Sequence, residues 1–224
     1  MKKIVIASFA GGVGKTTTAH SCATAMSEYG KKTVLIDADP NASLTFLTGI
    51  ENPRFTLREV LAGSSLESSV VSTGERFSFL PSSARLNEIA EFKELPDTAT
   101  FDIALIDTAS SLSAICVELI KSADRVVIPV TETFISIRSA LHIKDFLGTT
   151  AASIIRILDC GLSVEAKLEL SKEFTILEPK IRRDTTVGQN ELSKVSVLTS
   201  APKSDIASDY REVSYSILEE LGMI

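Results

Sequence analysis

Short apolar runs separated by helix-length segments are the feature that most constrains the fold of this chain. Five runs are clear: KIVIASF at 3–9, KTVLID at 32–37, FSFLP at 77–81, FDIALID at 101–107 and RVVIPV at 125–130. Several are too uniformly apolar for a sheet with one face in water, and such runs are typical of parallel strands that helices cover on both sides. Two weaker runs, SIIRIL at 153–158 and FTILEP at 174–179, would extend the sheet.

The segments between these runs predict the helices that would cover the sheet. The predicted helices span residues 17–29, 82–94, 112–121, 137–147, 163–174 and 204–221, and the polar piece at 63–76 is predicted to be a surface loop. We therefore expect an α/β fold with a doubly wound, mostly parallel sheet of about seven strands and helices on both faces. The length suits a single domain over residues 1–224. Ligands of such sheets bind at the carboxyl ends of the strands.

Composition narrows the class of protein. Cys22, Cys116 and Cys160 are far apart and lack metal-ligand spacing, which favours a reducing cytoplasm over disulfides or structural zinc. The net charge of −6 argues against a chain that binds polyanions over its whole surface, so contact with nucleic acid would be local. The apolar run at the start is too short for a signal peptide and leads into glycines, and no window is long enough to span a bilayer.

The stretch ASFAGGVGKTTTA at 7–19 joins the first strand to the first helix. A strict G-x-x-x-x-G-K-[ST] pattern would need glycine at Phe9, yet the strand, glycine loop and helix are the context of a phosphate site. Lys15 would reach the β and γ phosphates, and the Thr16 hydroxyl would bind Mg²⁺. The residues predicted to bind the nucleotide are Gly11, Gly12, Val13, Gly14, Lys15, Thr16 and Thr17.

Three aspartates follow apolar strands. LIDADPN supplies Asp37 and Asp39, and LIDTASS supplies Asp107. A carboxylate at the end of a buried strand is costly unless a charged group awaits it, and a magnesium nucleotide would be such a group. Any one of them could simply cap a helix. Three in a chain with the glycine loop favour a metal and nucleotide site.

Together these motifs resemble the ParA/MinD family of deviant Walker-type ATPases, a group of P-loop NTPases. The family pattern is K-G-G-x-x-K-[ST], then D-x-D-P, then D-[ST]-P-P; this chain reads AGGVGKT, DADPN and DTAS, and the resemblance extends to RVVIPV and KIRRDTTVGQ. It implies ATP and Mg²⁺ as cofactors, with Lys15 as the phosphate lysine and Asp39 orienting or activating the hydrolytic water. Thr16, Asp37 and Asp107 would surround the metal, and ATP binding would close two subunits face to face.

The chain departs from the family pattern at three places. Ala10 stands where the family has its signature lysine, Asn41 stands where glutamine is usual, and Ala109-Ser110 replace two prolines. In the family, the signature lysine crosses the dimer interface and touches the phosphates of the partner subunit. A cation supplied in this way can be worth orders of magnitude in rate.

Two hypotheses follow from the missing lysine. A different cation could replace it, and ISIRSALHIKDF offers Arg138 and Lys144, although each alone could be a solvated charge on an amphipathic helix. Alternatively, the protein binds ATP tightly and hydrolyses it slowly or only with a partner. A branch of the family that positions carboxysomes also lacks this lysine.

The two sides of the family bind different surfaces, DNA or membrane. The tail YREVSYSILEELGMI has Arg211 as its only cation beside three glutamates, which anionic lipid would repel, so no membrane contact is expected. Segment 178–203 has five basic residues and three acidic ones. In the family, basic residues near this segment contact DNA phosphates without reading bases. The DNA-binding candidates are Lys180, Arg182, Arg183, Lys194 and Lys203.

The resemblance thus predicts an ATP-dependent homodimeric switch, cytoplasmic and nucleoid-associated, that binds DNA nonspecifically. It would segregate or position a plasmid, a chromosome locus or a carboxysome with a ParB-like or carboxysome-adaptor-like partner that stimulates slow ATP hydrolysis. The alternative is an ATP-binding regulator that hydrolyses ATP poorly or not at all. A third possibility, an iron–sulfur ATPase like the nitrogenase iron protein, needs two cysteines near the dimer face, where only Cys116 follows the Asp107 strand.

Overall fold

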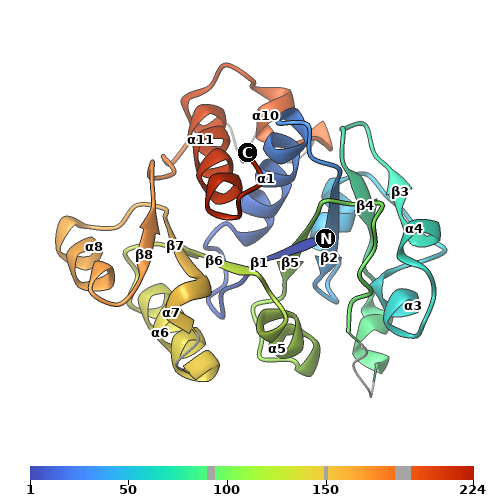
Figure 1. The fold of residues 1–224 in the computed structure, drawn as a ribbon, viewed down its shortest axis with the longest axis horizontal. Coiled ribbons are helices and arrows are strands. Elements are labelled where there is room, and N and C mark those ends of the chain that lie inside the picture. The colour runs from blue at the N-terminus through green and yellow to red at the C-terminus, as the bar shows by residue number, and fades with distance from the viewer. Residues whose placement is uncertain (90–93, 149–150, 185–192) are drawn as a thin grey trace.

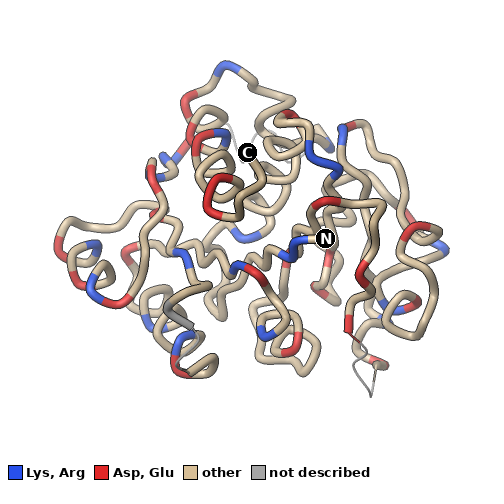
Figure 2. Tube along the Cα trace, in the orientation of Figure 1, with Lys and Arg blue, Asp and Glu red and all other residues tan. Residues whose placement is uncertain are grey.

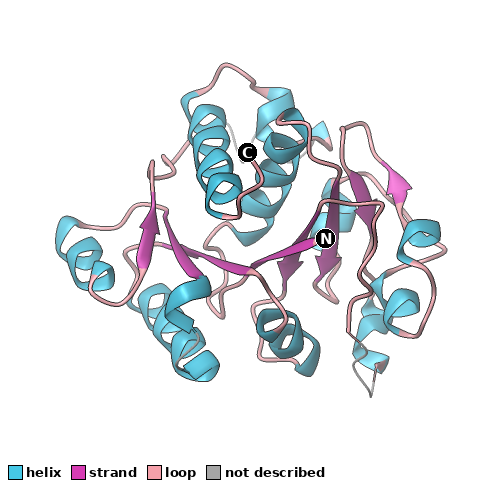
Figure 3. Cartoon of the chain, in the orientation of Figure 1, coloured by secondary structure: helices cyan, strands magenta, loops and turns pink. Residues whose placement is uncertain are grey.

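The computed structural model describes residues 1–89, 94–148, 151–184 and 193–224. Its centre is an eight-stranded sheet in the order β3-β4-β2-β5-β1-β6-β7-β8, seen nearly edge-on in Figures 1 and 3. Among the described strands, β3 and β4 pair antiparallel and all the other pairs are parallel. The strands are β1 Lys2–Ile6, β2 Thr33–Ala38, β3 Val71–Ser72, β4 Ser78–Leu80, β5 Ile103–Thr108, β6 Arg125–Val130, β7 Ile155–Asp159 and β8 Thr175–Leu177. The expected doubly wound fold is confirmed, with β3 as an additional edge strand.

Helices cover both faces of the sheet (Figure 1). One face carries α1 Lys15–Glu28, α10 Val197–Ser200 and α11 Asp205–Glu220, and the other carries α5 Ala114–Lys121, α6 Phe134–Leu147 and α7 Ala151–Ile154. Beyond one sheet edge lies α8 Val164–Ser171, and near the other lie α3 Leu57–Leu61 and α4 Leu66–Ser69. Two short helices, α2 Ser43–Leu47 and η1 Ala84–Glu88, follow β2 and β4.

The core forms two apolar layers, one on each side of the sheet. In β1, Val5 belongs to the layer shared with α5 and α6, whereas Ile4 and Ile6 belong to the layer shared with α1 and α11. This alternation buries both faces of the strand, which explains why the strand sequences are apolar throughout.

Some boundaries and short elements differ from the predictions. The helix expected at 82–94 is one short turn, Ala84–Glu88, followed by extended backbone at Ile89; residues 90–93 lie outside the described part of the chain. Leu86 is the buried residue of this turn. The five helices α2, α3, α4, α7 and α10 were not predicted. A capping box at Thr56 and Glu59 marks the start of α3 and was a readable signal.

The prediction of a surface loop at 63–76 was wrong in part, because this segment contains α4 and β3 and ends at a buried carboxylate. The Glu75 side chain is 2% exposed and lies 2.5 Å from the His20 ring of α1. Its other oxygen accepts hydrogen bonds from Ser196 Oγ at 2.7 Å and Thr199 Oγ1 at 2.6 Å. Burial acts to raise the pKa of Glu75, but hydrogen bonding and charge from His20 outweigh it and lower the pKa to about 2. We call these residues the Glu75 cluster.

Candidate nucleotide-binding site

The loop between β1 and α1 leaves open space at a helix N-terminus. Gly12 and Gly14 have φ angles of 71° and 92°, in the left-handed region that suits glycine. Gly14 is the N-cap of α1 and supplies no side-chain cap, so the first backbone N–H groups of the helix remain available. A Cβ built on Gly11, Gly12 or Gly14 would meet nothing within 4 Å. This arrangement suits an anionic ligand such as a phosphate group.

Lys15 is the buried cation of the site, at 7% exposure. Its Nζ donates hydrogen bonds to the carbonyl oxygen of Ala10 at 3.0 Å and to Oγ of Ser110 at 2.6 Å. Burial lowers the pKa of Lys15, while the charges of Asp107 and Asp39 act in the opposite direction. An ammonium group has three donors, so Lys15 can turn to another acceptor without leaving the site.

Two aspartates meet at the carboxyl edge of the sheet, as the sequence predicted. In the parallel pairing of β2 with β5, Asp37 lies directly opposite Asp107, and both are buried. Burial raises the pKa of Asp37 to about 6. Burial and the charge of Asp37 raise the pKa of Asp107 to about 8, against hydrogen bonding from Thr16 and the charge of Lys15. Both carboxyl groups therefore lie where burial disfavours their ionised form.

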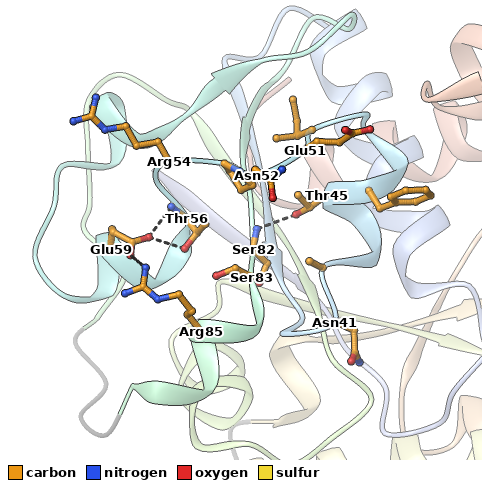
Figure 4. Close-up of a pocket in the computed structure, with 14 residues that line it drawn as sticks. Asn41, Thr45, Glu51, Asn52, Arg54, Thr56, Glu59, Ser82, Ser83 and Arg85 are labelled. Atoms are coloured by element: carbon orange, nitrogen blue, oxygen red, sulfur yellow. Dashed lines mark hydrogen bonds and ion pairs between the residues drawn. The ribbon is translucent and has the colours of Figure 1, made fainter.

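Hydrogen bonds shape the turn that carries Asp39. Asp37 accepts from the backbone N–H of Asp39 at 3.0 Å and from the N–H and hydroxyl of Thr45 at 2.9 and 2.7 Å. Asp39 in turn accepts from the N–H of Asn41 at 2.8 Å. Thr45 Oγ1 also accepts a hydrogen bond from the backbone N–H of Ser82. Both residues line a pocket of about 580 Å³, shown in Figure 4. The turn after β2 is therefore anchored to the end of β4.

The residues present fit a magnesium ion that is shared with a phosphate ligand. Asp107 Oδ1 is buried and has no hydrogen-bond partner within the protein, so this oxygen atom is available to bind a metal ion. Among the described residues, no group of three or more His, Cys, Asp or Glu side chains could hold a metal alone. Magnesium commonly takes one or two carboxylates and completes its shell with phosphate oxygens and water. Thr16 and Asp107 could contribute directly and Asp37 through water.

A cleft of about 480 Å³ adjoins the glycine loop and contains residues that the sequence reasoning did not assign to the site. The loop glycines and Thr17 form one wall, and Thr131 and Thr133 follow β6 at the same sheet edge. The rest of the lining is Val13, Cys160, Ile181, Arg182, Arg183, Asp184, Ile206 and Tyr210. Residues after β6, β7 and β8 meet here because parallel strands bring their carboxyl ends to one edge of the sheet. The predicted parallel order of the strands could therefore have indicated that these residues line the site.

The two candidates for a replacement cation lie at different ends of α6. Arg138 is exposed, one turn after the start of the helix, and its Nε lies 3.3 Å from His142 Nε2. Lys144 is in the last turn and forms an ion pair with Glu173. At about 1.5 Å per residue, Lys144 is roughly 9 Å further than Arg138 from the sheet edge that carries the phosphate loop.

The structure gives the DNA-binding candidates different surroundings. Arg182 makes a two-pronged pair with buried Asp209, with bonds of 2.8 to 3.2 Å, and a second pair with Asp205 at 2.8 Å. Arg183 lines the cleft beside it. Figure 2 shows basic and acidic positions interspersed over the fold. Lys180, Lys194 and Lys203 are exposed, and residues 185–192 of the predicted segment lie outside the described residues.

The described cysteines are poorly placed for an iron–sulfur cluster. Cys22 and Cys116 are buried, and Cys160 is partly buried in the cleft. Burial raises the pKa of the Cys116 thiol to about 11, so this thiol is not readily ionised for metal binding. The third possibility raised by the sequence gains no support from this arrangement.

Comparison with known proteins identifies the class to which this site belongs. Residues 1–156 match a family described as an AAA domain, so the chain belongs to that family. The match includes the glycine loop, Asp37, Asp39 and Asp107. The fold and the relatives below place the chain among ParA-like P-loop ATPases.

The relatives are distant and extend over most of the chain. A virulence plasmid ParA family protein of Chlamydia psittaci is 27% identical, covering 99% of this chain and 96% of its own length. Maintenance of carboxysome distribution protein A of Synechococcus elongatus is 29% identical over 66% of this chain and 65% of its own length. The solved structure of apo McdA from Cyanothece has a TM-score of 0.80 and 25% identity, covering 97% of this chain and 99% of that one.

Over the described residues, every helix is too short or too polar to cross a bilayer. The C-terminal helix α11 packs against α1 and buries Tyr210, Val213 and Ile217. Its apolar side therefore belongs to the core.

Proposed function

We propose that this chain is a magnesium-dependent switch that binds ATP, dimerises and hydrolyses ATP slowly. The observation that carries the proposal is the group formed by Lys15, Asp37 and Asp107 beside the open glycine loop. Both carboxyl groups have raised pKa values, and Asp107 Oδ1 has no partner. A pair of carboxyl groups with raised pKa values, at the sheet edge where ligands of this fold bind, is typical of a functional site.

Each residue has a separate task in this proposal. The loop N–H groups and Lys15 bind the phosphates, and Thr16 and Asp107 hold the metal, which supplies neutralisation of phosphate charge when bound. Asp37 fixes the turn through its bonds to Asp39 N–H and Thr45. Asp39, partly exposed at this edge, orients the hydrolytic water. Catalysis would rest on positioning and electrostatics, as in other phosphoryl transfers.

Exposed apolar side chains at the same edge support the proposed face-to-face dimer. Leu112 after β5 is 60% exposed, and Phe134 and Ile135 at the start of α6 are 75% and 69% exposed. Large apolar side chains gathered at one edge are typical of protein interfaces. Closing two copies there would cover these side chains together with the phosphate loop. Arg138, near the start of α6, is the better placed candidate for a cation that crosses the interface.

DNA binding and a stimulating partner complete the proposal. Lys180, Arg183, Lys194 and Lys203 would contact DNA phosphates without sequence preference, which would associate this cytoplasmic protein with the nucleoid. Arg182 is better assigned to its pair with Asp209. The cargo would be a plasmid, a chromosome locus or a carboxysome, and an adaptor protein would stimulate turnover. The similarity to plasmid ParA, carboxysome distribution and McdA proteins supports this set of cargoes.

Single-turnover hydrolysis tests the enzymatic proposal. Radiolabelled ATP is mixed with excess protein and Mg²⁺, with and without nonspecific DNA and the product of the neighbouring gene. We expect slow release of phosphate that DNA or the partner increases, and its loss in Asp39→Ala. No turnover under any condition, with Asp39→Ala indistinguishable from the wild type, would refute hydrolysis.

A second candidate function is an ATP-binding regulator that hydrolyses ATP poorly or not at all. The observation that favours it is Ala10, whose methyl side chain offers no charge to a partner subunit and whose carbonyl oxygen accepts a hydrogen bond from Lys15 of the same chain. The same assay separates the two functions, because a regulator would bind and retain ATP unchanged. Ala10→Lys would then be expected to increase turnover only if the dimer forms.

A further inference from the structure

The loop after β5 places a hydroxyl group beside the phosphate lysine. Ser110 Oγ accepts a hydrogen bond from Lys15 Nζ at 2.6 Å and donates one to the carbonyl oxygen of Ala10 at 3.4 Å. Ser110 is otherwise exposed, while Ala10 and Ala109 are buried. The family pattern that this chain resembles has proline here, and proline offers no hydroxyl.

The position of this hydroxyl indicates which phosphate it would meet. A phosphate-loop lysine reaches the β and γ phosphates, and the backbone N–H groups of the loop take the inner phosphates. Ser110 lies one hydrogen bond from that ammonium group. It also follows Asp107 by three residues at the end of the same strand. Lys15, Asp107 and Ser110 therefore surround the place that the outermost phosphate would occupy.

We propose that Ser110 is a specificity-determining residue whose hydroxyl donates to the terminal phosphate of ATP and so favours ATP over ADP. This inference rests on the proposed nucleotide binding. In the nucleotide-free protein the hydroxyl holds Lys15 against the loop. When Lys15 donates to phosphate oxygens instead of Ser110, the Ser110 hydroxyl is free to donate a hydrogen bond to the terminal phosphate. ADP also takes the lysine but has no phosphate to accept from Ser110.

Ser110 can affect nucleotide binding in two ways, through its bond to Lys15 and through its contact with the terminal phosphate. Release of Lys15 from Ser110 is needed for both nucleotides, because the lysine contacts the β phosphate that both contain. That cost cancels in the ratio of the two affinities. The ratio of ATP to ADP affinity therefore reports the contact with the terminal phosphate alone.

Calorimetric titration of the full chain with Mg²⁺ and either ADP or the β,γ-imido analogue of ATP tests the inference. Ser110→Ala should lower the ratio of ATP-analogue affinity to ADP affinity by about tenfold, as expected for the loss of one hydrogen bond to a charged acceptor, whatever common change the freeing of Lys15 adds to both affinities. Ser110→Thr, which keeps a hydroxyl, should retain the preference. The matched control is Ser111→Ala, at the exposed neighbouring serine, which should change neither affinity.

Three results would overturn the inference while leaving the proposed function intact. They are equal weakening of both nucleotides by Ser110→Ala, equal tightening of both, which would mean that the serine merely sequesters the lysine, and no change in either. Absence of binding of both nucleotides to the wild type would overturn the proposed function and this inference together.

Discussion

Replacing Asp107 by asparagine should stabilise the nucleotide-free protein at alkaline pH, although Asp107 belongs to the proposed catalytic site. In the folded chain, burial and the charge of Asp37 raise the pKa of Asp107 to about 8. In the unfolded chain an aspartate titrates near about pH 4. Between these values the folded state holds a proton that the unfolded state has lost. Stability is therefore fully present below about pH 4 and falls as the pH rises to about 8.

The size of this effect follows from the difference between the two pKa values. Each pKa unit corresponds to about 1.4 kcal/mol, so the interval from about 4 to about 8 gives at most about 6 kcal/mol. Asparagine has nearly the same shape as the protonated acid and cannot ionise, so Asp107→Asn avoids this loss. A gain of 1 kcal/mol raises the melting temperature of a protein of this size by about 2 to 4 °C.

Thermal unfolding without nucleotide, in a chelator, measures the effect at about pH 5 and about pH 8.5. We expect Asp107→Asn to melt at least about 5 °C above the wild type at the higher pH, with a smaller difference at the lower one. Asp124→Asn is the matched control: partial burial acts to raise the pKa of Asp124, but hydrogen bonds from Lys2 and Lys3 hold it below its ordinary value. That variant should lose stability at the higher pH. If Asp107→Asn is no more stable than the wild type there, the reasoning is refuted.

Three further predictions concern the remaining features. Arg182→Ala should lower the midpoint of unfolding in urea, because it leaves buried Asp209 without its cation, whereas Arg183→Ala should leave the midpoint nearly unchanged; equal shifts would contradict the structural role of Arg182. Glu75→Gln should cost about 2 kcal/mol or more in the same assay, because the buried carboxylate that accepts from Ser196 and Thr199 is replaced by a neutral amide, and an unchanged midpoint would count against this. Phe134→Asp should retain binding of the ATP analogue but lose the nucleotide-dependent dimer in light scattering; a dimer that persists would exclude this face.

The sequence predicts the sheet and the phosphate site for the same physical reason. Uniformly apolar runs require burial on both faces, which in turn requires parallel strands with helices above and below. Parallel strands end at one edge, so Asp37 and Asp107 could be expected to meet, and the register places them directly opposite each other. The glycine loop adds the helix N-terminus at that edge.

The parts that could not be predicted depend on partners far apart in the chain. The serine-rich segment around Glu75 reads as an ordinary loop, because nothing near it reveals that His20 of α1 will receive its carboxylate. Arg182 reads as a free cation until the fold brings Asp209 beneath it. The bond between Ser110 and Lys15 joins residues 95 positions apart. Local patterns contain no information on such pairings.

The Glu75 cluster determines which parts of the chain can open separately. One carboxylate ties the β3–β4 turn to α1 and to the start of α10. If any one of these segments separated from the others, it would leave a charged group buried without its partners, which costs several kcal/mol. The β3–β4 turn and the start of α10 should therefore exchange their amide hydrogens as one cooperative unit. Their exchange should be no faster than the exchange of α1, the helix that follows the phosphate loop.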